Sequence, residues 1–130
     1  AEFTGRFKKD RKPLAAIALN ADTAAITCIA NDFGYDQVFS RQLEALGNSS
    51  DILIAISTSG NSPNVINAVK KSKEKNIYSI GLIGKDGGKL LNLCDSCITV
   101  KSNDTARIQE AHIFIGHILC TLIEKKLNLD

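Results

Sequence analysis

Short apolar runs alternate with longer amphipathic stretches along most of the chain. Four of these runs have the length of a β-strand, at residues 14–19, 52–56, 78–83 and 97–100. The run Ile-Leu-Ile-Ala-Ile at 52–56 has no alternating polar positions, which is typical of a strand that is covered on both faces. We therefore expect four buried strands, with residues 52–56 in the middle of a parallel sheet.

Apolar residues at helical spacing fill the segments between these runs. We expect helices at about 22–30, 35–46, 63–75, 89–93 and 106–127, and we interpret residues 1–7 as the end of a helix that begins earlier. The expected buried stripes of the two longest amphipathic patterns are Val38, Phe39, Gln42, Leu43 and Leu46, and then Ile108, Ala111, Ile115, Ile118, Leu119 and Leu122.

Strands that alternate with helices predict the α/β class, as a three-layer α/β/α sandwich with a parallel sheet of the flavodoxin-like type. Right-handed crossovers bring the carboxyl ends of all strands to one edge, where ligands of open α/β sheets bind. The loops expected at that edge are 20–23, 57–62, 84–88 and 101–105. For the loop at 84–88 (Gly-Lys-Asp-Gly-Gly), a tight connection is favoured over a direct contact with a ligand.

The turn after the run at 52–56 is rich in hydroxyl groups, with the sequence Ser57-Thr58-Ser59-Gly60-Asn61-Ser62-Pro63-Asn64. Ser62 is expected to cap the following helix, and Pro63 suits its first position. Free backbone N–H groups and hydroxyls at a helix N-terminus favour a phosphate or a carboxylate. An ordinary capped turn explains the pattern equally well. The loop is neither a Walker motif nor a dinucleotide-binding glycine motif.

Composition restricts the function only broadly. The 130 residues are 44% hydrophobic and 23% charged, which fits one globular domain. A net charge of +2 argues against a nucleic acid or a membrane as partner, and no apolar run approaches membrane-spanning length. We expect a cytoplasmic enzyme or binding module. The four cysteines are expected to be buried thiols, and the Cys94/Cys97 pair lacks a second pair for zinc (Cys28, Cys94, Cys97 and Cys120).

The expected last helix carries Gln109, His112 and His117 on an otherwise apolar surface. Gln109 and His117 are about two turns apart and could converge on one ligand at the flank of the helix. For an isolated helical histidine, a hydrogen-bonded place in the core or an interface is the favoured explanation. Spacing alone leaves both possibilities open.

The loop 57–62 resembles the phosphosugar loop of the sugar isomerase (SIS) domain. Four further stretches are similar to the phosphoheptose isomerase family within it: Ala-Glu-Phe-Thr-Gly-Arg-Phe at 1–7, Asn-Asp-Phe-Gly at 31–34, Gly-Lys-Asp-Gly-Gly at 84–88 and Ala-Arg-Ile-Gln-Glu-Ala-His at 106–112. The resemblance implies isomerisation of sedoheptulose 7-phosphate to D-glycero-D-manno-heptose 7-phosphate through an enediol, as the first step of ADP-heptose biosynthesis. It also implies a cytoplasmic homotetramer with active sites between subunits, and heptose for lipopolysaccharide or another surface glycan.

The same resemblance implies a role for each matching residue. Glu2 would be the base that moves a proton between C1 and C2, and His117 the partner acid. Zinc would be held by Glu2, Gln109 and His117, and Gln109 would also bind the sugar. The phosphate would be held by Ser57, Ser59 and Ser62, the sugar hydroxyls by Thr58 and Asp32, and a substrate oxygen by Arg6.

Some family features are missing from the sequence. The chain has no methionine and starts at Ala1, and it lacks the family's first helix, a central strand, a Gly-Asn-Gly-Gly-Ser loop and a histidine four residues before Glu2. We therefore expect a single SIS domain over residues 1–130 whose native protein continues before Ala1. Ala106 stands where some members carry aspartate, and Asp104 or Thr105 is the candidate replacement.

Two other classes share parts of this pattern. One is a non-catalytic SIS protein of the DnaA initiator-associating type, which lacks the carboxylate and the histidine that match Glu2 and His117. The other is a regulatory SIS module that senses sugar phosphates and would need the phosphate loop alone. The presence of both Glu2 and His117 favours the isomerase.

Overall fold

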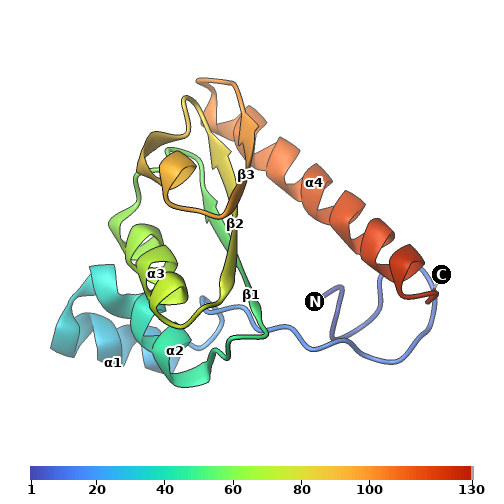
Figure 1. The fold of residues 1–130 in the computed structure, drawn as a ribbon, viewed down its shortest axis with the longest axis horizontal. Coiled ribbons are helices and arrows are strands. Elements are labelled where there is room, and N and C mark those ends of the chain that lie inside the picture. Colours follow the sequence, from blue (N-terminus) through green and yellow to red (C-terminus); the bar gives the residue numbers. More distant parts are fainter. Residues whose placement is uncertain (130) are drawn as a thin grey trace.

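A parallel three-stranded sheet forms the centre of the computed structural model, which describes residues 1–129. The strands lie in the order β1-β2-β3 (Figure 1). They are β1 (Ile52–Ser57), β2 (Tyr78–Gly84) and β3 (Ser96–Val100). The helices are α1 (Thr23–Phe33), α2 (Val38–Leu46), α3 (Pro63–Glu74) and α4 (Thr105–Lys126), with 3-10 turns η1 (Tyr35–Gln37) and η2 (Gly88–Asn92).

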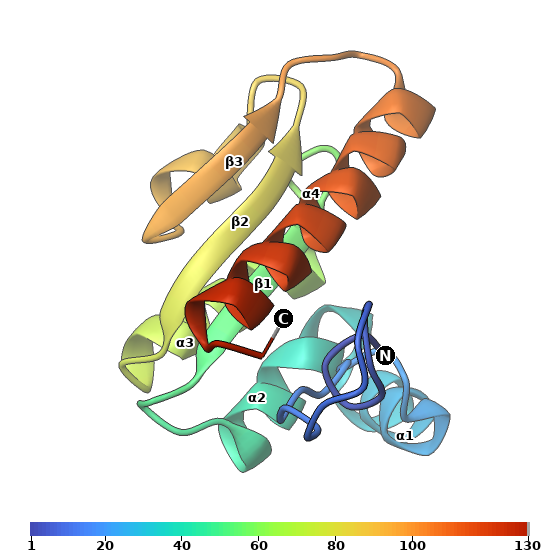
Figure 2. The same ribbon diagram turned by 90° about the vertical axis from the view of Figure 1, so that its right-hand side faces the viewer.

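Helices lie on both sides of this sheet, as the sequence predicts (Figures 1 and 2). The helix α3 packs on one face, with α2 and α1 beside it, while α4 crosses the other face near the ends of β2 and β3. The α/β class with a parallel sheet is therefore confirmed, and the predicted bounds of β1, β2, β3 and α3 agree with the structure within one residue. The core between sheet and α3 consists of Ala55, Ile66, Val69, Ile83 and Leu90.

The predicted strand at residues 14–19 is wrong. Residues 11–18 have no regular secondary structure, and Ile17 is 73% exposed. The carbonyl of Leu19 accepts a hydrogen bond from the side chain of Gln42 (2.9 Å) in place of a strand partner. A parallel strand is stable only beside a neighbour that takes up its backbone groups, and none of the described strands lies next to this run. The prediction that loop 20–23 lies at the carboxyl edge of the sheet depended on this strand, and no strand leads into the loop.

The strand β1 was predicted at the centre of the sheet, but it lies at one edge. Ile52, Ile54 and Ile56 are 61%, 44% and 55% exposed, whereas Ala55 and Ser57 face the core and are buried. The apolar run therefore has one covered face among the described residues, rather than two.

The helix predictions are correct in position but partly wrong in their buried faces. Residues 1–7 form turns rather than a helical end, and α1 continues through Asn31–Phe33 until Gly34 ends it. Leu46, Ile118 and Leu122 are exposed, and Cys28 is exposed rather than buried. In α4 the buried positions are Ile108, His112, Cys120 and Glu124. Ile108 and His112 contact β2, whereas Glu124 is covered by Arg11 from the N-terminal segment. Among residues 1–129, no helix combines the length and apolar character that crossing a membrane requires.

Candidate active site

The hydroxyl-rich loop between β1 and α3 is held by its own side chains. Ser57 is buried at the end of β1, and its Oγ lies 2.9 Å from Oγ of Ser62. Ser62 occupies the N-cap position of α3, yet its side chain makes no capping bond, so the predicted cap is wrong in that detail. The Oγ of Ser59 accepts a hydrogen bond from the N–H of Asn61 (3.1 Å). Pro63 begins α3 as predicted.

The loop 84–88 packs directly against this hydroxyl-rich loop. Gly60 has φ +66°, and a Cβ added there would lie 2.5 Å from the carbonyl carbon of Gly87. The carbonyl of Gly60 accepts from the N–H of Leu90 (3.0 Å), and the side chain of Asn61 accepts from the N–H of Lys89 (3.1 Å). The favoured prediction, a tight connection, is confirmed, and this connection buttresses the hydroxyl-rich loop.

The start of α4 adjoins the same corner. Asp104 caps the helix by accepting a hydrogen bond from the N–H of Ala106 (2.9 Å). A Cβ on Gly84 would meet both the carbonyl of Thr58 (2.5 Å) and the side chain of Ile108 (2.6 Å), so these three elements are in close contact. His112 is buried, and because a carbonyl can only accept, its Nε2 donates to the carbonyl of Ile83 (3.1 Å). The hydrogen-bonded core role favoured for a helical histidine is confirmed for His112.

A second cluster forms where residues 1–12 lie beside the C-terminal half of α4 (Figures 1 and 2). The ring of Phe7 lies 5.5 Å from the ring of His117, at 32° to it. The guanidinium of Arg11 bonds both the carbonyl of Glu2 (2.7 Å) and the carboxylate of Glu124 in α4 (2.6 Å). The segment that carries Glu2 therefore lies beside the C-terminal half of α4, which also carries His117.

The remaining predicted residues lie apart from both clusters. Asp32 is exposed in the last turn of α1 and accepts from the side chain of Asn31 (2.7 Å). Arg6 is exposed and donates to the carbonyl of Lys8 (3.4 Å), and Gln109 is exposed near the start of α4. Residues 1–129 therefore form two local groups, one around Ser57–Ser62 and one around Glu2 and His117, rather than one assembled pocket.

A hollow of about 360 Å³ lies beside Ser62 and the start of α3. It includes Tyr35 and Asp36, whose backbone carbonyl accepts from Asn67 of α3 (3.1 Å). Neither residue was among the predicted site residues. Both residues directly follow the Asn-Asp-Phe-Gly stretch that resembles the family, and this could have marked them as candidates. Because about 25 residues separate them from Ser62 along the chain, the sequence did not show that they lie beside it.

Comparisons with known proteins show the family. A family described as "SIS domain" matches residues 1–84. Phosphoheptose isomerase 1 of Campylobacter jejuni is 58% identical over 125 residues, which is 96% of this chain and 67% of that protein. The chain belongs to the phosphoheptose isomerase family of SIS domain proteins.

Solved structures of this family have the same fold. Phosphoheptose isomerase from Francisella tularensis matches with a TM-score of 0.91 and 41% identity, covering 95% of this chain and 66% of that one. The enzyme from Neisseria gonorrhoeae matches with a TM-score of 0.83 and 50% identity, covering 85% and 62%. The chain thus spans about two thirds of the length of these relatives.

The zinc expected from the family resemblance can be tested against the donors present. Among residues 1–129, no group of three or more His, Cys, Asp or Glu side chains is placed to hold a metal ion. Glu2 and His117, however, are donors of the types that zinc takes. Gln109 precedes His117 by roughly 12 Å along the helix axis. The donor types of Glu2 and His117 therefore suit zinc, whereas Gln109 stands about two turns away on the same helix.

The Cys94/Cys97 pair shows no sign of metal or redox chemistry. All four thiols are free, and the two sulfurs of the pair lie against Gly81 of β2. Burial, followed by the charge of Cys97, raises the pKa of the Cys94 thiol to about 12. A thiol with such a pKa is a poor nucleophile at neutral pH, and both sulfurs pack on β2 at Gly81.

Proposed function

We propose that this protein isomerises sedoheptulose 7-phosphate to D-glycero-D-manno-heptose 7-phosphate, the first step of ADP-heptose biosynthesis. The observation that carries the proposal is the 58% identity to a protein named phosphoheptose isomerase over nearly the whole chain. It is supported by the two clusters, since one offers hydroxyls at a helix N-terminus and the other offers a carboxylate and an imidazole.

The hydroxyl-rich loop would hold the phosphate end of the sugar. Ser57, Ser59 and Ser62 supply hydroxyl groups next to the N–H groups that open α3, and the helix dipole favours an anion there. Thr58 and Asp32 would bind sugar hydroxyls, Gln109 would contact the sugar, and Arg6 would bind a substrate oxygen. The packing of Gly60 on Gly87 keeps the loop rigid, which reduces the entropy lost on binding.

Glu2 and His117 would perform the proton transfers. The Glu2 carboxylate removes a proton from C1 while His117 donates one to the carbonyl oxygen at C2, which gives the enediol. The O1 proton then leaves to His117, and Glu2 returns its proton to C2, so the aldose forms with no net gain or loss of protons. The proposal is supported by the position of the segment that carries Glu2, which lies beside the half of α4 that carries His117.

We also propose zinc as a cofactor, held by Glu2 and His117 with Gln109. Bound there, the ion would polarise the substrate carbonyl. Metal removal by a chelator should lower turnover, and added zinc should restore it; elemental analysis of the purified protein measures the content. Full activity of metal-free protein would refute the cofactor.

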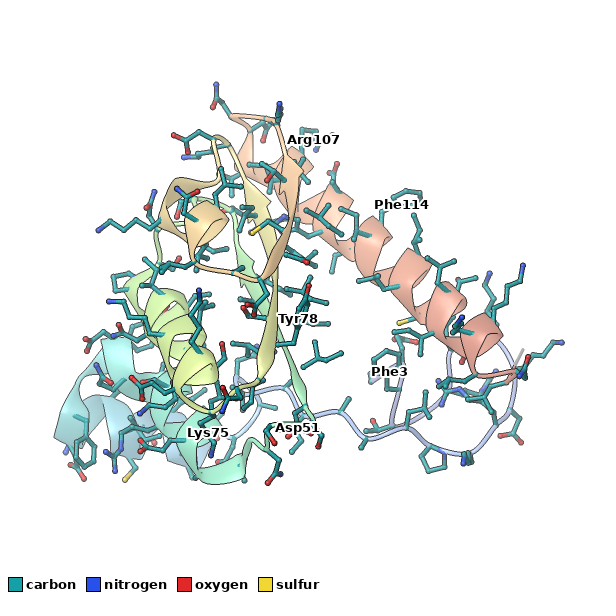
Figure 3. The ribbon with its side chains drawn as sticks, viewed as in Figure 1. Phe3, Asp51, Lys75, Tyr78, Arg107 and Phe114 are labelled. Atoms are coloured by element: carbon teal, nitrogen blue, oxygen red, sulfur yellow. The ribbon has the colours of Figure 1, made fainter. Side chains whose placement is uncertain are left out.

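The assembly and location are further parts of the proposal. Exposed Phe114 and Ile113 of α4 and exposed isoleucines of β1 support burial against other subunits, in the homotetramer with interfacial sites expected from the family. Figure 3 shows Phe114 on the side of α4 that faces away from the sheet. Light scattering after gel filtration would measure the mass. A cytoplasmic location and the absence of a nucleic-acid or membrane partner stay predictions.

The direct test uses the full-length protein that contains these residues. Incubation with sedoheptulose 7-phosphate should give the aldose heptose phosphate, detected by NMR or mass spectrometry. Glu2→Gln should abolish turnover, since the amide cannot accept the C1 proton, and should leave substrate binding within a few fold. Turnover retained in this variant would remove Glu2 from the base role. No turnover by the wild-type protein with zinc, together with binding to a replication initiator, would favour the non-catalytic class.

A further inference from the structure

An arginine outside every predicted site holds the backbone of the segment that carries Glu2. The Nε of Arg11 lies 2.6 Å from Oε1 of Glu124 near the end of α4, and each side chain is only 3% exposed. Its Nη2 donates to the carbonyl of Glu2 (2.7 Å), and its Nη1 donates to the carbonyl of Phe3 (2.9 Å). One guanidinium thus joins α4 to the peptide groups on both sides of the Phe3 Cα.

Glu124, the residue of α4 that Arg11 contacts, lies on the same side of the helix as His117. Glu124 follows His117 by seven residues, which is about two turns, so both point to the same side of α4. Residues 1–12 therefore meet that side at two points, with Phe7 on the ring of His117 and Arg11 on the carboxylate of Glu124. Both contacts tie the segment that carries Glu2 to the helix that carries His117.

The rest of the segment gives Glu2 little independent support. Residues 2–4 form a turn in which the N–H of Gly5 donates to the carbonyl of Ala1 (2.8 Å), and the N–H of Leu14 donates to the carbonyl of Phe3 (2.9 Å). A turn outside helix and sheet can shift as a unit unless it is fastened. The Arg11 fork fastens it, because a guanidinium presents several N–H donors in a fixed plane.

We propose that Arg11 and Glu124 are positioning residues, which set the place of the Glu2 carboxylate relative to His117. This inference rests on the proposed isomerase function. Neither residue touches substrate in it, and both act through the backbone of Glu2. Misplacing a catalytic group by about 1 Å can lower the rate by roughly 100-fold while leaving the substrate anchor untouched. The anchor here is the distant loop around Ser57.

The first variant is Arg11→Lys in the full-length protein. Lysine keeps the charge opposite Glu124, but its single ammonium cannot bond Glu124 and both carbonyls in the same plane. We expect kcat to fall by about 10- to 100-fold, with KM for sedoheptulose 7-phosphate within about threefold of wild type. Glu74→Gln is the matched control, since it breaks an exposed ion pair with Lys71 on α3 and should change neither constant by more than about twofold.

The double variant Arg11→Glu with Glu124→Arg distinguishes an effect on the placement of Glu2 from an effect on the stability of the fold. It restores a buried ion pair, yet glutamate at position 11 has no donor for the carbonyls of Glu2 and Phe3. We expect the melting temperature to recover relative to Arg11→Glu alone, whereas kcat stays low. If kcat recovers with the melting temperature, the pair is only structural and the inference is overturned.

Arg11→Ala with added guanidinium ion covers the case in which the lysine variant does not fold. A guanidinium that fills the vacated space can bond Glu124 and the two carbonyls, so kcat should rise saturably at millimolar concentration. Unchanged kcat in Arg11→Lys, or no rescue of a folded Arg11→Ala, contradicts the inference. These outcomes differ from failure of the proposed function, in which wild-type protein itself shows no turnover.

Discussion

The clearest constraint at the scale of single residues is the contact of Gly60 with Gly87. Gly60 adopts φ +66°, a conformation that glycine takes without strain, and any Cβ would collide with the backbone of the neighbouring loop. A glycine in an anion-binding loop would let the backbone approach the anion closely, since it carries no Cβ. In the structure the close approach is made by another loop, and the distance of 27 residues between the two glycines concealed this.

Gly60→Ala should therefore destabilise the fold by about 2 kcal/mol or more, because both the φ strain and the collision must be relieved. Gly116→Ala is the matched control. It lies inside α4, where an added Cβ meets nothing within 4 Å, and it should stabilise by about 0.5–1 kcal/mol. Urea unfolding followed by circular dichroism measures both. Equal effects of the two substitutions would refute the interlocked loops.

The rate at which each cysteine thiol reacts should depend on its exposure and its pKa. Cys28 is exposed on α1, whereas burial raises the pKa of the Cys94 thiol to about 12. Iodoacetamide at pH 8 should modify Cys28 first and Cys94 at least about tenfold more slowly, because the thiolate is the reactive form. Peptide mass mapping over time gives the order, and unfolded protein, where all four thiols should react alike, is the control. Early modification of Cys94 would contradict its placement.

At the scale of elements, the strand–helix pattern predicts the region from β1 onward well. The elements β1, α3, β2 and β3 have their partners close along the chain, so local pattern and final structure agree for them. The run at 14–19 has equally strong apolar character but no neighbouring strand in residues 1–129, and it stays irregular. For α4 the spacing predicts a helix but not its buried side, since that side is divided between the sheet and residues 1–12.

The link between β2 and β3 supplies a prediction about pH. Both the hydroxyl (2.6 Å) and the backbone N–H (2.7 Å) of Ser79 donate to Asp95, and these bonds lower the pKa of that carboxyl. A carboxyl group whose pKa is lower in the folded state than in the unfolded state stabilises the fold at pH values above its unfolded pKa of about 4. This stabilisation is lost as the pH falls through the pKa of the folded state. Asp95→Asn should thus lower the melting temperature at pH 7, and the difference from wild type should shrink as the pH falls below the unfolded value of about 4.

Thermal unfolding of both proteins between pH 2.5 and pH 7 measures this difference. Ser79→Ala serves as the control from the other side of the contact: it removes the hydroxyl bond but keeps the backbone bond, so it should show a partial loss of pH dependence. A difference between wild type and Asp95→Asn that is constant over this range would mean that the carboxylate charge contributes nothing there.

At the scale of the whole molecule, the family resemblance predicted which residues matter but not how they are distributed. Ser57 and Ser62 lie where β1 leads into α3, whereas His117 lies in the C-terminal half of α4, beside the segment that carries Glu2. Figure 1 shows this half of α4 extending away from the sheet. Sequence patterns could not show this separation, because it depends on the angle at which α4 crosses the sheet. The roles implied for these residues stay proposals until the kinetic tests are done.

On the side of the sheet opposite α3, the strand β1 exposes a row of apolar side chains. Ile52, Ile54 and Ile56 of β1 share this face with Tyr78 of β2, which Figure 3 shows on the side turned toward α4. An edge strand with an apolar face associates readily with other chains. The 130-residue chain produced by itself should therefore form concentration-dependent oligomers or aggregates.

Ile54→Lys should reduce this association at least about tenfold in the dissociation constant, since a charged side chain at the centre of the patch would have to be desolvated. Sedimentation velocity over a range of concentrations gives the measurement, and circular dichroism checks the fold. Ile17→Lys is the matched control: Ile17 is 73% exposed but lies in the irregular segment away from the strands, and its replacement should leave association unchanged. Equal effects of the two lysines would show that general charge, rather than the face of β1, governs association.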